Sequence, residues 1–503
     1  MAVAMYGPES AGTFTTKTVA AVMNTVGTRQ TWVWFTSWAS QWSPACAFLQ
    51  HAPIHWLTRG VFVGKRKTHL SPQIDDLELA TDLYSPNGTT FRIRPADLDG
   101  HVSWQVDLNS RLPAGSSFRL ELGHNGNGDI DVVTNPTSGA GVCFPDYPVY
   151  TNDVADTALE WVKPLGTGVD AWPVEFQTCA LLDPLTTWYQ TSSNRDAFAH
   201  VSHTFTHLEL NNATYHDAAR EIQFNEAWLT QTGIASGAHF SPHGLIPPAI
   251  IGLHNGDVIQ AWLNNGVTHV VGDNTRPILR NPTSVYWPAI STTVINCYDG
   301  LVISTRFATF IYYSCDTFDC DVTEWHALIG TSGTYQDMLT LSKNENTNYL
   351  FNLQANPYMF HQANMRLIDA PTYTVGPKTG RMSLVQLWVE TVAQELARLT
   401  NWPIISLTHD ENAQYFLDRM ALDNCHPGAT YTLTSDGKGI SQIVVTTNGN
   451  TCSVPVPVTI PSGSASTSGG SVTADQVGSE PPIQWVTLNG SPVTLTFNPP
   501  IAI

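Results

Sequence analysis

The sequence predicts an α/β protein built on a distorted (β/α) barrel that is followed by a C-terminal β-sandwich. Between residues 61 and 425, short apolar runs alternate with amphipathic segments, which is the pattern of a parallel sheet with crossover helices. At this length a closed barrel is favoured over an open sheet. From residue 426 onward, alternating Val- and Thr-rich runs are separated by turn signals such as Asp436-Gly437, which favours a sandwich.

The first 60 residues form a separate aromatic-rich segment, so the predicted order is 1–60, 61–425 and 426–503. Within the first part we expect a helix over 15–26, before a Trp-dense stretch. A chain of 503 residues can bury a large core and is expected to form two or three domains.

The barrel region contains two helical patterns that are clearer than the rest. Residues 214–229 follow two possible capping residues, Asn211 and Asn212, and residues 384–399 carry apolar side chains at helical spacing. The sandwich is expected to cover the barrel rather than to bind sugar, because Trp485 is its one evident aromatic platform.

Composition excludes some classes of function. The formal charge is -19, which disfavours binding to nucleic acid because phosphate contacts require Lys and Arg. Only 13% of residues are charged while Trp and Tyr number 16 each, which suits an uncharged glycan as partner. No run approaches the ~18 apolar residues of a membrane-spanning helix, so no membrane span is expected.

Polar side chains end six of the candidate strands. In a parallel barrel the carboxyl ends of the strands share one mouth, where catalytic groups converge. The six clusters are Asp75-Asp76, His124 to Asn127, His203 to His207, Asp273-Asn274, His361 and His409-Asp410.

Two of these clusters together contain the groups needed to activate a water with a metal ion. One Asp and two His can hold a divalent ion and leave positions open for water and a carbonyl oxygen. The second Asp would remain free as a base. Adjacent residues of a strand point opposite ways, so Asp75 and Asp76 can divide these roles only if the strand ends and twists there. Hydrolysis is the chemistry that this pattern indicates.

Spacing alone does not select the histidine pair. Among 17 His, three pairs are four residues apart: His51 with His55, His203 with His207, and His239 with His243. The first contains an internal Pro and has no carboxylate at a nearby strand end, so packing is its better interpretation. The pair His239 and His243 remains a candidate to line the site.

Several motifs resemble those of the polysaccharide deacetylases, the NodB-homology carbohydrate esterases, and more closely carbohydrate esterase family eighteen, founded by a secreted fungal enzyme that acts on galactosaminogalactan. The resemblance spans about residues 20–460. The stretches that carry it are 71–77 (SPQIDDL), 121–128 (ELGHNGNG), 202–207 (SHTFTH), 272–277 (GDNTRP) and 360–364 (FHQAN).

The resemblance implies a barrel of the polysaccharide-deacetylase type and a role for each motif. Asp76, His203 and His207 would bind one divalent metal, with Zn²⁺ expected and cobalt or nickel also compatible. Asp75 would be the catalytic base, and His361 would protonate the departing amine. Arg276 would orient the base, with an ordinary ion pair to Asp273 as the alternative.

Further residues are expected to bind substrate or to tune the site. The substrate-binding candidates are His124, Asn125, Asp273, Tyr286, Trp287 and Tyr358. His409 and Asp410 are candidates to tune His361, because the family motif that does so is missing from this sequence. The implied activity is metal-dependent removal of acetyl groups from N-acetylhexosamine, with N-acetylgalactosamine expected, in an exopolysaccharide of the kind found in biofilms.

Eight Cys and the sequons at Asn87 and Asn212 indicate a secretory route, so a secreted, cell-wall or extracellular glycoprotein is expected. We expect local disulfide bonds between Cys315 and Cys320 and between Cys425 and Cys452, although sequence does not fix connectivity. The resemblance implies a precursor that extends upstream of residue 1. A monomer is expected.

Two other functions remain open at this point. In a glycoside hydrolase, Asp75 or Asp76 would pair with a distant carboxylate across a sugar, and no metal would be needed. A non-catalytic wall protein would keep the fold and bind glycan. Loss of activity on chelation, together with release of acetate rather than reducing ends, separates the deacetylase from both.

Overall fold

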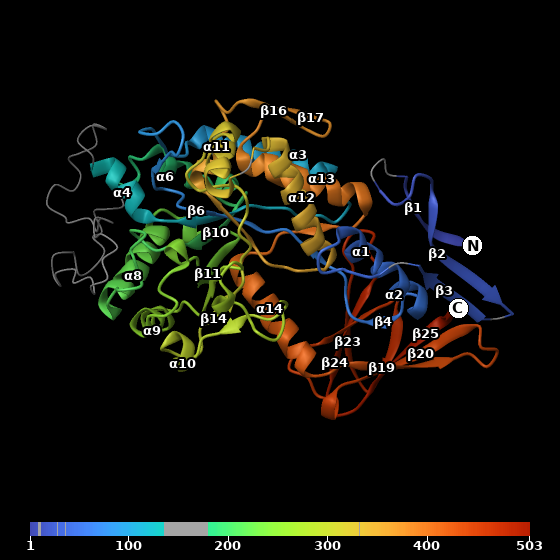
Figure 1. Ribbon diagram of the computed structural model, residues 1–503. Helices are drawn as coiled ribbons and strands as arrows, with labels where there is room; N and C mark the ends of the chain where they lie inside the picture. Colours follow the sequence, from blue (N-terminus) through green and yellow to red (C-terminus); the bar gives the residue numbers. More distant parts are fainter. Residues whose placement is uncertain (9–11, 28, 36, 135–179, 331) are drawn as a thin grey trace.

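The computed structural model describes residues 1–503 except 9–11, 28, 36, 135–179 and 331. It has three parts: a small N-terminal sheet, a central α/β body and a C-terminal β-sandwich (Figure 1). The fold class predicted from the sequence is confirmed.

The central body is built on an eight-stranded sheet of order β13-β14-β12-β11-β10-β9-β6-β15. All neighbouring strands pair in parallel except β13, which is antiparallel to β14. The strands are β6 (Pro72–Asp75), β9 (Glu121–His124), β10 (Ala199–Ser202), β11 (Phe240–Leu245), β12 (His269–Val271), β13 (Ala289–Ile290), β14 (Val302–Ser304) and β15 (Tyr358–His361).

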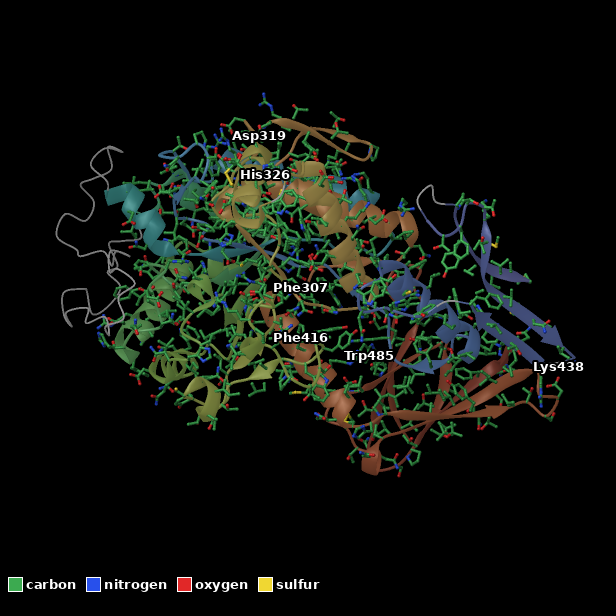
Figure 2. The ribbon with its side chains drawn as sticks, viewed as in Figure 1. Phe307, Asp319, His326, Phe416, Lys438 and Trp485 are labelled. Carbon is green, nitrogen blue, oxygen red and sulfur yellow. A yellow bond between two sulfur atoms is a disulfide. The ribbon has the colours of Figure 1, made fainter. Side chains whose placement is uncertain are left out.

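The sheet curves until the two ends of its parallel part, at β14 and β15, meet. Phe307, just beyond β14, forms a parallel bridge with Tyr358 of β15. Its backbone N–H donates to Pro357 at 2.8 Å, and its carbonyl accepts from the N–H of Met359 at 3.0 Å. Figure 2 marks Phe307 in the middle of this body. The bridge closes a distorted barrel, and the carboxyl ends of its strands therefore share one rim.

Helices cover the barrel, and both helices predicted from the sequence are present, as α8 and α13. The side chain of Thr214 caps α8, and Ser383 with Gln386 forms a capping box on α13. The helices of the body are α3 (Pro95–Arg111), α4 (Gly126–Thr134), α6 (Pro184–Tyr189), α7 (Ser192–Arg195), α8 (Tyr215–Gln231), α9 (Gly256–Asn264), α10 (Thr293–Asn296), α11 (Phe318–Ile329), α12 (Tyr335–Phe351), α13 (Leu384–Leu399) and α14 (His409–Asn424).

Three short strand pairs complete the body. They are β5 (Thr68–His69) with β18 (Ile404–Ile405), β7 (Thr81–Asp82) with β8 (Thr90–Phe91), and β16 (Thr372–Val375) with β17 (Lys378–Arg381). No described helix is both long and apolar enough to cross a membrane.

The N-terminal part differs from its prediction. Residues expected to form a helix over 15–26 instead contain β2 (Thr18–Val26), the central strand of an antiparallel sheet with β1 (Ala2–Tyr6) and β3 (Arg29–Trp34). The β-branched residues of Thr-Val-Ala-Ala-Val-Met-Asn-Thr-Val favour a strand, and pairing on both sides decides the outcome. Two short helices follow, α1 (Pro44–Leu49) and α2 (His51–Thr58).

The C-terminal part is a sandwich of two four-stranded sheets, as predicted. One sheet has the order β19-β20-β25-β22 and the other β23-β24-β21-β4. The strands are β4 (Phe62–Val63), β19 (Gly428–Leu433), β20 (Gly439–Thr446), β21 (Val456–Thr459), β22 (Ala465–Ser468), β23 (Gly470–Asp475), β24 (Ile483–Leu488) and β25 (Val493–Ala502). Although β4 lies within the range predicted for the barrel, it pairs with β21.

The junction between body and sandwich is held by covalent and polar contacts. A disulfide bond between Cys425 and Cys452 joins the end of α14 to the sandwich, and Cys315 with Cys320 forms a second bond, so both predicted pairs are confirmed. The ammonium of Lys65 lies 4.5 Å from the ring centroid of Tyr415 and 4.9 Å from that of Trp485, which Figure 2 marks beside α14.

Candidate active site

The two adjacent carboxylates lie at the carboxyl end of β6, where the strand stops. Asp75 is its last residue, and Asp76 adopts a left-handed backbone conformation with φ 64°. This turn lets the neighbouring side chains serve one site, as their predicted division of roles requires. Asp75 is 3% exposed, whereas the side chain of Asp76 is 17% exposed.

The histidines come from the loop after β10. The Nε2 atom of His203 lies 3.0 Å from Oδ1 of Asp76, and Nε2 of His207 lies 3.4 Å from the same oxygen. One ligand atom from each of these three residues lies within 4.8 Å of the others, so the group could hold a metal ion. The geometry brings together the three residues predicted to bind metal.

The hydrogen bonds of His203 determine which nitrogen faces Asp76. Its Nδ1 lies 2.7 Å from the carbonyl oxygen of Ile246, which can only accept, so Nδ1 carries a proton. If the ring is neutral, Nε2 then carries no proton and directs its lone pair at a carboxylate oxygen of Asp76. Two acceptors at this distance require a proton or a cation between them. A hydrogen bond from the other ring nitrogen to a backbone carbonyl is also how proteins orient histidines that bind metal.

The electrostatics of these residues agree with this arrangement. Burial raises the pKa of Asp76, but the nearby His207 and His203 outweigh it and hold this pKa well below its usual range. Burial lowers the pKa of His203, but the hydrogen bond to Asp76 and the charges of both carboxylates raise it above the ordinary value. The group therefore favours positive charge next to Asp76.

The loop that carries the histidines is fixed from beneath. Thr204 and His207 have left-handed φ values of 67° and 62°. The side-chain amide of Asn125 donates to the carbonyls of His203 at 2.5 Å and Thr204 at 2.9 Å. The carboxylate of Glu221 accepts from the backbone N–H and the hydroxyl of Thr206. These contacts stabilise a backbone shape that non-glycine residues rarely adopt.

Asp75 is paired with Arg306, and not with Arg276 as the family resemblance implied. The guanidinium donates to both carboxylate oxygens, Nη1 to Oδ1 and Nη2 to Oδ2, each at 2.8 Å. Burial raises the pKa of Asp75, but the charge of Arg306 outweighs this and lowers it below its usual value. Asp75 is therefore ionised at neutral pH.

Arg276 lies elsewhere. Its Nε is 3.2 Å from Oδ2 of Asp273, and Nη1 donates to the carbonyl of Ile250 at 2.8 Å. This is the ordinary ion pair that was the alternative interpretation. Arg306 follows the apolar run Leu301-Val302-Ile303-Ser304, so its place just past a strand was the signal that could have identified it.

His361 stands beside Asp75 because β15 and β6 pair in register at these residues. Its Nε2 is 3.9 Å from Oδ2 of Asp75, and its Nδ1 has no hydrogen-bond partner within the described residues. Burial lowers its pKa. The exposed ring of Tyr313 lies 5.7 Å from that of His361, an aromatic neighbour that the sequence did not indicate.

Three of the predicted substrate-binding residues are buried and cannot touch a polymer. His124 and Asn125 are 0% exposed; His124 hydrogen-bonds to Glu78 at 2.7 Å and to His200 at 2.8 Å. Tyr358 is also fully buried and packs on Trp388 with ring centroids 5.0 Å apart. These predictions were wrong, because His124 and Asn125 at the end of β9 turn into the protein and Tyr358, the first residue of β15, packs in the core.

The other candidates have partners of their own. The hydroxyl of Tyr286 donates to the carbonyl of Asn352, and the guanidinium of Arg419 lies 4.9 Å from its ring centroid. The indole of Trp287 donates to Asp423 at 2.9 Å. These contacts are with α14 and the end of α12. Asp273 stays at the rim, partly exposed, and remains a candidate.

His409 and Asp410, considered for tuning His361, form no hydrogen bond or ion pair with it. They open α14 and lie next to His269 instead. The sequence analysis placed them at the mouth of the barrel beside His361. That placement was wrong, because His269 is the first residue of β12 and so lies at the opposite end of the strand.

A barrel whose rim combines a paired carboxylate base, an Asp-His-His group and a further histidine defines a hydrolase site of the deacetylase class. Three family models match the chain: the Agd3 CBM87 over residues 1–56, the Agd3 deacetylase domain over 70–430 and the Agd3 C-terminal domain over 431–501. No curated protein matches.

Solved structures agree with the family models. The chain is similar to the crystal structure of Agd3, described as a novel carbohydrate deacetylase, with 44% identity and a TM-score of 0.90, covering 99% of this chain and 74% of that one. A match to endo-glycoceramidase II from Rhodococcus sp. reaches 9% identity and a TM-score of 0.20, covering 91% of this chain and 92% of that one, and carries no argument. The chain belongs to the Agd3 deacetylase family and is a carbohydrate deacetylase.

Proposed function

We propose that this carbohydrate deacetylase is a metal-dependent N-deacetylase that acts on N-acetylgalactosamine residues of an exopolysaccharide. The observation that supports it most directly is that Nε2 of His203 and Oδ1 of Asp76 lie 3.0 Å apart with His207 beside them, an arrangement that requires a cation or a proton between the nitrogen and the oxygen. Two imidazoles and one carboxylate suit zinc, and also cobalt or nickel. When bound, such an ion supplies a water of lowered pKa and polarises the acetamide carbonyl.

The residues of the chain supply the proton transfers. Asp75, kept ionised by Arg306, accepts the proton of the attacking water. The bidentate contact also fixes the direction in which the carboxylate points. His361, at the next strand, delivers a proton to the sugar nitrogen as the C–N bond breaks, because an amide anion is a very poor leaving group.

Polymer binding and location extend the proposal. Residues 1–56 match a CBM87 model, which supports a polysaccharide rather than a small sugar as substrate. Asp273 at the rim is proposed to contact the polymer. The two disulfide bonds and the exposed sequon at Asn87 support secretion into an extracellular or cell-wall setting as a glycoprotein, and we propose a monomer.

The test measures two products on one polymer. The protein is stripped with a chelator, assayed on a polymer rich in N-acetylgalactosamine, and assayed again after zinc is returned. Acetate release that is lost and then restored supports the proposal. Release of reducing ends without acetate would indicate a glycoside hydrolase, and polymer binding without either product under any added metal would indicate a non-catalytic protein.

Substrate choice is tested on the same preparation. Equal amounts of polymers of N-acetylgalactosamine and of N-acetylglucosamine are supplied to the zinc-loaded protein. We expect the first to be deacetylated faster. A preference for the second would reject the proposed sugar while leaving the metal-dependent chemistry intact.

A further inference from the structure

A second group of metal-ligating side chains lies away from the catalytic rim. His269 is the first residue of β12, while His409 and Asp410 are the first two residues of α14. One ligand atom from each lies within 4.8 Å of the others. Because β12 starts here and ends near Asp273 at the rim, this group sits at the opposite, amino-terminal end of the strands.

The group of His269, His409 and Asp410 is linked to the strand that carries Asp75 through the buried carboxylate of Glu121. Gln73 and Asp75 share one face of β6, since successive side chains alternate. Gln73 donates to the buried carboxylate of Glu121 at 2.9 Å, and the other oxygen of Glu121 accepts from the backbone N–H of His409 at 2.7 Å. The cluster is therefore one layer below the catalytic base, and it shares no residue with the catalytic site.

His409 is the residue that an ordinary hydrogen-bonded cluster leaves unexplained. It is 2% exposed, and neither of its ring nitrogens makes a well-formed hydrogen bond in the part of the chain that the structure describes, although the backbone of Leu245 lies near the ring. Leaving a buried polar group without a hydrogen-bond partner destabilises the folded state. By contrast, His269 and Asp410 satisfy each other, with Nε2 2.8 Å from Oδ1. Among the described residues, no side chain satisfies the ring nitrogens of His409.

The backbone of β11 leaves room where these side chains meet. A Cβ built on Gly244 would lie 2.4 Å from Nδ1 of His409 and 3.0 Å from Oδ1 of Asp410. The nitrogen and the oxygen thus approach one point beside a residue that has no side chain. Because no positive φ is involved at Gly244, space and not conformation excludes a larger residue here.

We propose that His269, His409 and Asp410 form a second divalent-cation site, with a structural role, that fastens the start of α14 to β12. Two imidazoles and a carboxylate favour a zinc-like ion over calcium or magnesium, which prefer oxygen ligands. The hydroxyl of Thr268, 3.0 Å from Nδ1 of His269, can accept the proton that this ligand would keep on its outer nitrogen.

Modest adjustment would complete the coordination. Zinc ligands lie about 2.0–2.2 Å from the ion in a tetrahedron, so Nε2 of His269 and Oδ1 of Asp410 would separate by about half an ångström or slightly more from their present 2.8 Å. The carboxylate of Asp410 is 25% exposed and can move. Since α14 runs to the disulfide bond at Cys425, the ion would help fix the helix that connects the barrel to the sandwich.

The experiment counts bound zinc in the full-length chain. Four proteins are stripped with a chelator, loaded with excess zinc, dialysed against metal-free buffer and analysed by elemental mass spectrometry. They are the unmodified chain, His203→Ala, Asp410→Asn, and His243→Ala as a control. Asp410→Asn keeps the shape of the side chain, so it is preferred over substitution of the buried His409.

The proposal expects two zinc ions in the unmodified chain and in the control, and one in each of the other two variants. A count of one in the unmodified chain and in Asp410→Asn, with none in His203→Ala, would overturn it. A count of one in the unmodified chain and in His203→Ala, with none in Asp410→Asn, would keep this site and reject the catalytic one, so the two failures are distinguishable.

A stability measurement checks the structural role. In the His203→Ala background, chelation should lower the melting temperature by several degrees, and adding Asp410→Asn should abolish this shift. Unchanged melting on chelation of the single variant would contradict a structural ion at this place.

Discussion

Both terminal nitrogens of Arg306 lie 2.8 Å from the two carboxylate oxygens of Asp75, and both side chains are nearly inaccessible to solvent. This bidentate pairing fixes both the charge and the direction of Asp75, the proposed catalytic base. Replacing Arg306 by Lys keeps a charge but loses the planar pair of donors. We expect kcat to fall about 10²-fold, as it does when a reacting group is misplaced by an ångström, with bound metal unchanged.

The matched control for this variant is Arg276→Ala. That guanidinium is 45% exposed and pairs with Asp273, so its loss should leave kcat within a few-fold of the starting value. Steady-state kinetics on the polymer check both variants. A larger loss for Arg276→Ala than for Arg306→Lys would return the role to Arg276.

Asp75→Asn removes the proton acceptor and keeps the volume of the side chain. Positioned general bases contribute about 10²–10⁴-fold to rate, so kcat should fall by that factor. Metal content should not change, because Asp76 and the histidines supply the ligands. Acetate release and elemental analysis of the same sample test this prediction, and loss of metal together with activity would place Asp75 among the ligands.

His203→Ala removes the most buried of the three proposed ligands. We expect the chain to lose one bound ion and essentially all acetate release at stoichiometric zinc. Partial recovery in excess zinc would mean weakened ligation. The control is His239→Ala, from another histidine pair with the same spacing, which should retain both metal and activity; equal losses would indicate a general effect on folding.

His361→Ala should slow the departure of the amine and spare the activation of water. Substrates with good leaving groups need no proton at that step, so an activated acetate ester should lose less rate than the acetamide. On the acetamide we expect a loss of about 10²–10⁴-fold. The comparison of the two substrates is the measurement, and equal losses on both would reject the acid role.

The junction at Lys65 makes stability depend on pH. Burial lowers the pKa of Lys65 from 10.5 to about 8, so between these values the unfolded chain binds more protons than the folded chain. The free energy of unfolding contributed by this residue therefore rises with pH across that window, and its cost is fully present below about pH 8. Relative to Lys65→Gln, the unmodified chain should gain on the order of 2 kcal/mol over this range.

Urea unfolding at pH 8, 9 and 10 measures this gain. Lys438→Gln, which removes an exposed lysine from the turn between β19 and β20, is the control and should show the same pH dependence as the unmodified chain. A parallel response of Lys65→Gln and the unmodified chain would contradict the assignment.

The part of the site carried by local motifs could be predicted from the sequence. Asp75, Asp76, His203 and His207 each sit next to a strand end, and a parallel barrel gathers such ends at one rim. The two amphipathic helices were also predictable, because their apolar spacing and caps are local signals.

The parts that depend on distant pairing could not be predicted. Arg306 and Arg276 each follow a strand, and only the closed sheet shows which of them reaches Asp75. Polar residues at the end of β9 point inward to support the histidine loop, which alternation alone does not reveal. The sequence of the segment that contains β2 predicts a helix, and only the hydrogen bonds to β1 and β3 on either side make it a strand.

The place of β4 has a consequence for how the molecule is made. The hydroxyl of Thr459 donates to the carbonyl of Gly64, 395 residues earlier, and β4 pairs with β21 just before that point. During synthesis these early residues leave the ribosome long before their partner strand exists. A truncation that deletes the C-terminal sandwich would leave β4 without its partner strand β21. A shortened version of this enzyme should therefore keep β4 and the C-terminal sandwich together.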